Sequence, residues 1–114
     1  MDYGEFLPHI DVKDGVTRVL NNQKLYFDLL KRFKGKAMTD NLLDAIASGN
    51  HAEVVQVAHA LKGTAANLGF PVVYRVSEEI ETLAKKGEPC ESLSHEIKAA
   101  INDLEQAVAK LVGA

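Results

Sequence analysis

The stretch that most clearly decides the fold is residues 50–69, which read NHAEVVQVAHALKGTAANLG. Its apolar positions recur every three to four residues, which is typical of an amphipathic helix with one buried face. Asn50 can cap the start of this helix, Glu53 completes a capping-box pattern, and Gly69 suits the end. At about 100° per residue, the centre of the apolar stripe lies roughly 150° from His59. His59 is therefore expected to point away from the core.

Helical patterns also flank this stretch on both sides, and turn-forming residues separate them. Asp11 can cap a short helix that runs to about residue 20. The apolar spacing of residues 22–48 favours one long helix. A break near Lys34-Gly35-Lys36 stays open, because glycine in a helix costs about 1 kcal/mol relative to alanine. Two further helices are predicted, one from Pro71 to about Gly87 and one from about Ser92 to the end.

The number and spacing of these helices predict the fold class. No segment alternates with period two, so strands are not expected. Four substantial amphipathic helices joined by short loops pack most simply side by side in alternating directions. We therefore predict an all-α fold, an up-and-down antiparallel four-helix bundle with a short additional N-terminal helix that covers one end. The 114 residues are expected to form a single domain, because a chain of this length buries roughly two-thirds of its unfolded surface.

Composition narrows the classes of function. The net charge of −3 argues against nucleic-acid binding, which needs a basic surface, and gives no support to binding at an anionic membrane. The single Cys90 cannot form an internal disulfide, no apolar run is long enough to span a membrane, and the N-terminus lacks the basic region of a signal peptide. We therefore expect a cytoplasmic protein, most simply a monomer. No carboxylate cluster suits a metal and no glycine-rich loop suits a nucleotide, so neither a cofactor nor ATP-dependent kinase activity is expected.

The candidate reactive group is His59, because a neutral imidazole can attack a phosphoryl group and carry it covalently. Lys62, one helical turn along, supplies a cation within reach of the phosphoryl oxygens. Gly63 leaves the flank of the imidazole open to a partner. Small and apolar residues on the same helix face suit a flat docking surface for another protein, namely Ala52, Val55 and Ala66. The competing interpretations are a solvated lysine at position 62 and a close helix–helix contact at position 63.

The run HALKGTAANLG, residues 59–69, resembles the signature of histidine-containing phosphotransfer (HPt) domains. That signature is a histidine, any residue, an aliphatic residue, Lys-Gly, two small residues, then an aliphatic residue and a glycine. Residues 14–20 and 25–33 are similar in style to the first two helices of the family. The resemblance implies that His59 is the phosphoacceptor, Lys62 the lysine that neutralises the phosphoryl charge, and Gly63 the glycine that permits close approach. It also implies a phosphorelay intermediate, which accepts a phosphoryl group from a receiver-domain aspartate and passes it to another.

The same resemblance implies the partners and the position of one supporting residue, and the helix pattern adds a second. The partners would be receiver domains of response regulators and hybrid histidine kinases, with Mg²⁺ bound in the acidic pocket of the receiver. Many family members carry Gln or another polar residue on the next helix, near the acceptor, where this chain has Glu81. Glu81 is expected either to orient the His59 ring by accepting its Nδ1 proton or to face water. Asn67 flanks the exposed face, where it either contacts a partner or caps the helix end.

Two other functions stay open from the sequence. The chain could be the phosphoacceptor module of a chemotaxis-type histidine kinase, or it could be a binding protein that sequesters receiver domains without turnover. A zinc site is not expected, because no other histidine lies at metal-ligand spacing from His59. Cys90 is interpreted as incidental, and Lys85-Lys86 as a solvated face.

Overall fold

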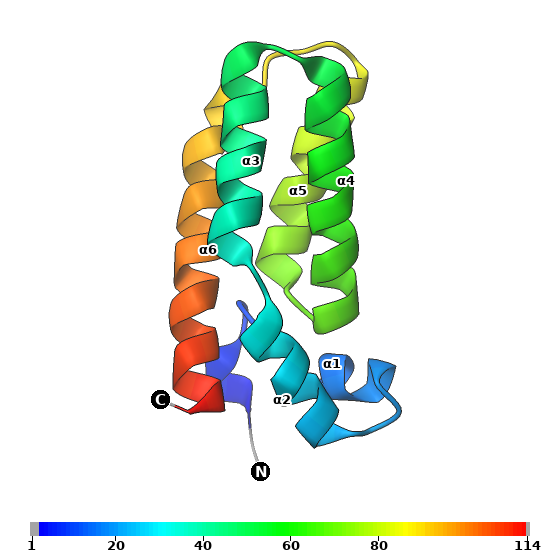
Figure 1. Ribbon diagram of the computed structural model, residues 1–114, viewed down its shortest axis with the longest axis vertical. Helices are drawn as coiled ribbons and strands as arrows, with labels where there is room; N and C mark the ends of the chain where they lie inside the picture. The colour runs from blue at the N-terminus through cyan, green and yellow to red at the C-terminus, as the bar shows by residue number, and fades with distance from the viewer. Residues whose placement is uncertain (1–2, 114) are drawn as a thin grey trace.

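The structure is a computed structural model, described here for residues 3–113, and this part consists of helices joined by short loops (Figure 1). It measures 44 × 24 × 21 Å along its principal axes. In chain order the elements are the 3₁₀ helix η1 (Gly4–Phe6) and the α-helices α1 (Val12–Arg18), α2 (Gln23–Arg32), α3 (Gly35–Ser48), α4 (His51–Leu68), α5 (Pro71–Lys85) and α6 (Glu91–Val112).

Helices α3 to α6 form the predicted up-and-down four-helix bundle, in which consecutive helices run in opposite directions (Figure 1). The most extensive contact joins α4 to α5, and the remaining sides of the bundle are the contacts α3–α4, α5–α6 and α3–α6. The shorter elements η1, α1 and α2 gather at the end of the bundle where the two termini also lie. The predicted short N-terminal helix is α1, and it contacts α4 and α2 at this end. No helix in residues 3–113 combines the length and the apolar character that crossing a membrane requires.

The ends of α4 follow the sequence signals closely. The Asn50 side chain accepts a hydrogen bond from the Glu53 backbone N–H at 3.1 Å, as an N-cap does. The helix stops at Gly69, which adopts the left-handed conformation (φ +76°) that a residue with a Cβ rarely takes. Pro71 then occupies the first turn of α5. This tight connection folds α5 back along α4 and fixes which residues of the two helices meet.

The prediction of one long helix over residues 22–48 is wrong, because the chain breaks between α2 and α3. Phe33 leaves the helical conformation (φ −64°, ψ +126°), and a new helix starts at Gly35. The Phe33 ring packs on Phe70, with ring centroids 5.1 Å apart. Gly35 is buried where α3 meets α6, and a Cβ there would lie 2.9 Å from the Glu105 carboxylate. The open alternative, a break near Gly35, is therefore the observed one, and tertiary packing rather than local propensity places it.

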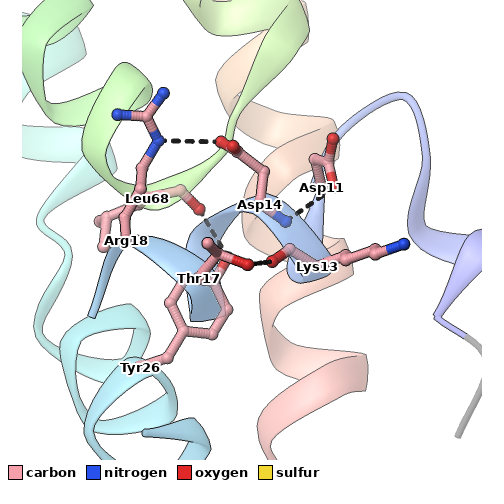
Figure 2. A network of polar contacts seen from close by, with 7 residues as sticks. All are labelled: Asp11, Lys13, Asp14, Thr17, Arg18, Tyr26 and Leu68. Carbon is pink, nitrogen blue, oxygen red and sulfur yellow. Dashed lines mark hydrogen bonds and ion pairs between the residues drawn. The ribbon is translucent and has the colours of Figure 1, made fainter. Parts of the chain in front are cut away.

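Helices α1 and α2 are fastened to the C-terminal end of α4, as Figure 2 shows. The Asp11 side chain accepts a hydrogen bond from the Asp14 N–H and so caps α1, while the Asp11 N–H donates to the Gly69 carbonyl at 2.7 Å. The buried Tyr26 of α2 donates its hydroxyl hydrogen to the Leu68 carbonyl. Gly15 of α1 lies against the Tyr26 ring, where a Cβ would overlap the ring atoms. The end of α4 is thus held by both short helices.

Candidate functional site

His59 lies on the outward face of α4, near the middle of the helix. The inward-facing residues of the helix, which include Ala58 and Leu61 on either side of it, are fully buried in the core. The His59 side chain keeps 69% of its surface exposed. The structure therefore presents this imidazole to solvent and to any partner that approaches α4.

Glu81 is the buried centre of the site. It lies on α5, opposite His59, and its side chain is only 4% exposed, so it does not face water. Its Oε2 atom is 3.0 Å from His59 Nδ1, and its Oε1 atom is 2.7 Å from Lys62 Nζ. The Lys85 ammonium lies 3.2 Å from Oε2. One carboxylate thus binds the imidazole and two lysines.

The charges of these groups follow from their contacts. The hydrogen bond from Lys62, assisted by those from Lys85 and His59, lowers the pKa of Glu81 from its ordinary 4.5 to about 2, although burial acts in the opposite direction. The same hydrogen bond between Glu81 and Lys62 raises the pKa of the lysine. Both side chains are therefore ionised at neutral pH, and the carboxylate stays charged in its buried position because cations surround it.

The contact with Glu81 selects one form of the His59 ring. An ionised carboxylate has no proton to donate, so Nδ1 must carry the hydrogen and donate it to Glu81 Oε2. In the neutral imidazole the lone pair then lies on Nε2. No group within residues 3–113 makes a hydrogen bond to Nε2. The free nucleophilic atom of the ring is therefore the one that points away from Glu81.

Gly63 is exposed one turn beyond His59, and a Cβ at this position would have no contact within 4 Å to any part of residues 3–113 beyond its own stretch of helix. The competing interpretation, a close contact between helices inside the bundle, therefore has no support in the structure. The small residues expected on the same face are also at the surface: Ala52 is exposed, and Val55 and Ala66 are half-buried. Ala66 lines a shallow groove with Tyr74, which is among the few exposed large apolar side chains in the described part.

Asn67 is exposed beside this face, and its side chain makes no hydrogen bond within residues 3–113. The end of α4 is formed by the left-handed Gly69 instead. Within the same range, no three His, Cys, Asp or Glu side chains come together in a way that could hold a metal ion.

Sequence reasoning missed the part of Lys85 in this cluster and interpreted it as a solvated lysine. Its side chain is indeed 60% exposed, but its ammonium pairs with Glu81. The signal was present in the sequence, because Glu81 and Lys85 are four residues apart in one helix and such pairs face each other. What the sequence left open was whether Glu81 binds the His59 ring or faces water, and so whether Lys85 reaches the same cluster.

Comparison with known proteins identifies the family. The family model of the Hpt domain matches residues 28–107, which include all of α3, α4 and α5 and most of α6. The chain belongs to the Hpt domain family. Hpt domains are phosphotransfer modules of two-component signalling, and the chain is therefore such a module.

Among solved structures, this Hpt domain is similar to the HPt domain of an Hpt sensor hybrid histidine kinase from Shewanella. The two chains are 20% identical, the similarity covers 90% of this chain and 92% of the other, and the TM-score is 0.79. At this level of identity the comparison establishes the common fold. No curated protein sequence matches the chain.

Proposed function

We propose that this Hpt domain is a phosphorelay intermediate that accepts a phosphoryl group on His59 from the aspartate of one receiver domain and passes it to the aspartate of another. The observation that carries the proposal is the exposed imidazole whose Nδ1 is bonded to the buried Glu81 and whose Nε2 is free. Such a ring is held in the orientation and the tautomer that a nucleophile needs.

In the transfer step, the Nε2 lone pair attacks the phosphorus atom of the receiver's aspartyl phosphate. A P–N bond forms and the P–O bond to the aspartate breaks, so that its electron pair stays with the released carboxylate. The imidazole becomes positively charged while it keeps its Nδ1 hydrogen, and the Glu81 carboxylate at 3.0 Å stabilises that charge. The onward transfer is the same step in reverse, with the aspartate of the next receiver as the attacking group.

The neighbouring residues have distinct roles in this proposal. Lys62 supplies positive charge for the phosphoryl oxygens, and Glu81 is a positioning residue that acts through His59 and Lys62. Gly63 leaves room for the receiver to bring its aspartate to Nε2, since within residues 3–113 nothing outside its own stretch of helix lies within 4 Å of the position that a Cβ would take. The surface residues Ala52, Val55 and Ala66 provide an apolar contact for the receiver, with Asn67 at its edge.

The proposed partners are receiver domains of response regulators and of hybrid histidine kinases, in the cytoplasm. Mg²⁺ is expected on the receiver, whose own acidic residues would bind it. Docking is expected to be brief, because a relay has to release each partner after transfer and affinity is tuned mainly through the dissociation rate.

The test is a phosphotransfer profile with purified receiver domains from the same genome, each phosphorylated with acetyl phosphate and mixed with the intact chain. We expect at least one receiver to transfer its label to the wild type and to His95→Gln, a control at an exposed histidine on α6, but not to His59→Gln. Tight receiver binding without uptake of label would support the sequestering protein instead. Uptake only from an ATP-bound kinase domain would support the chemotaxis-type module.

A further inference from the structure

Lys85 is the last residue of α5 and lies one turn beyond Glu81. Its ammonium and His59 Nδ1 bind the same carboxylate oxygen, Glu81 Oε2, at 3.2 and 3.0 Å. The distance from Lys85 Nζ to His59 Nδ1 is therefore at most the sum of these two contact distances. Its side chain is long enough to cover the remaining distance to a group attached at Nε2, on the far side of the ring.

The two lysines of the cluster differ in how firmly they are held. Lys62 is 23% exposed and makes the shorter contact, 2.7 Å, to an oxygen that it shares with no other group in the described part. Lys85 is 60% exposed, makes a longer contact, and shares its oxygen with His59. Because the Lys85 side chain is mostly exposed, solvent screens its contact with the buried Glu81, and this contact is more easily exchanged than that of Lys62. Lys62 is the fixed cation of the site and Lys85 the movable one.

The charge of the cluster also points to an incoming anion. The charged groups around the imidazole are two ammonium groups and one carboxylate, which leaves one positive charge in excess. A phosphoryl group at neutral pH brings nearly two negative charges. Lys62 supplies its charge from a fixed position beside Glu81, so the cation that can move toward the phosphoryl oxygens is Lys85, whose contact with Glu81 is longer and more exposed.

We propose that Lys85 is a second phosphoryl-binding residue, whose ammonium leaves Glu81 Oε2 and binds the phosphoryl oxygens when His59 is phosphorylated. This inference rests on the proposed function, in which His59 carries the phosphoryl group. The phosphoryl group is then bound by residues from both α4 and α5, whereas the signature run lies on α4 alone.

The experiment uses phosphoramidate as a small phosphoryl donor, so that contacts between Lys85 and a receiver cannot contribute. Its P–N bond breaks as the bond to His59 Nε2 forms, and ammonia leaves. We expect Lys85→Gln to lower the rate of His59 phosphorylation about three- to tenfold, as the loss of one exposed charge-assisted hydrogen bond would do. Lys85→Arg keeps the charge and should restore most of the rate. Lys86→Gln, an exposed neighbour, is the matched control and should leave the rate unchanged.

A second comparison separates direct contact from an effect through Glu81. In a Glu81→Gln background, a direct contact of Lys85 with the phosphoryl group predicts that Lys85→Gln still slows phosphorylation by a similar factor. Loss of the effect in that background would overturn the proposal, and so would equal rates for Lys85→Gln and the wild type. In both of those cases His59 is still labelled and the proposed relay stands. If His59 takes no label from phosphoramidate or from any receiver, the relay and this inference both fail.

Discussion

Replacing Glu81 with Gln tests whether the buried carboxylate is held by its cations. Glutamine has nearly the same shape but no charge, so the variant removes the ion pairs with Lys62 and Lys85 and leaves the packing of α4 on α5 in place. The carboxylate has a pKa of about 2 in the folded chain against an ordinary 4.5. A group whose pKa is lowered by folding stabilises the fold above its unfolded pKa, and the stabilisation is lost as the pH falls through the folded pKa.

The size of the effect follows from this difference in pKa. If it were realised in full, the stabilisation at neutral pH would be about 3 kcal/mol. The side chains of Lys85 and His59 are mostly exposed, and solvent screens their part of the interaction. We therefore expect Glu81→Gln to lower the free energy of unfolding by about 1–2 kcal/mol at pH 6, and that difference from the wild type to shrink by about half or more at pH 3.

The assay is urea unfolding of the wild type and the variant at pH 6, 4 and 3, followed by circular dichroism. Other carboxylates titrate in both chains, so their contributions cancel in the difference. Glu79→Gln is the matched control, because Glu79 pairs with Arg75 at the surface of the same helix, and it should change the free energy by no more than about 0.5 kcal/mol. A Glu81→Gln difference that stays constant with pH, or a variant that is more stable than the wild type at pH 6, would refute the reasoning.

Four further predictions concern two glycines and a tyrosine. Gly15→Ala should destabilise the fold by about 1–3 kcal/mol in urea unfolding, because the added Cβ overlaps the buried ring of Tyr26; an unchanged midpoint would show that α1 is not docked as described. Tyr26→Phe should cost about 1–3 kcal/mol, since the Leu68 carbonyl loses a buried donor, and a neutral result would mean that water replaces it. Gly63→Ala should raise the free energy of unfolding by about 0.5–1 kcal/mol, because its Cβ meets nothing. Gly63→Leu should fold equally well but slow transfer from receivers, and equal transfer rates would remove the access role of this glycine.

Local signals in the sequence were sufficient to predict the helices that carry the site and the face on which His59 lies. The capping residue Asn50, the stop at Gly69 and the start at Pro71 fix the ends of α4 and the direction of α5, and all three lie where the sequence predicts. The 3.6-residue period alone places His59 on the outward face. These features depend on residues within one or two turns of each other, which is why the sequence carries them.

The features that could not be predicted depend on contacts between distant segments. The break at Gly35 is accompanied by packing against α6, about 70 residues later in the chain, and the local helix pattern left the break open only through the glycine itself. The joint binding of His59, Lys62 and Lys85 by Glu81 requires the register between α4 and α5. The family resemblance placed Glu81 near the acceptor but left open whether it binds the ring or faces water, and only its burial distinguishes the two.

The most direct measurement is the position of the label after the chain has been phosphorylated by a receiver domain. Mass spectrometry under neutral conditions, with ³¹P NMR to identify the nitrogen, reports both the residue and the atom. The account predicts a single phosphoryl group on His59, attached to Nε2, while Glu81 keeps Nδ1. A label on another residue, or on Nδ1 of His59, would contradict it.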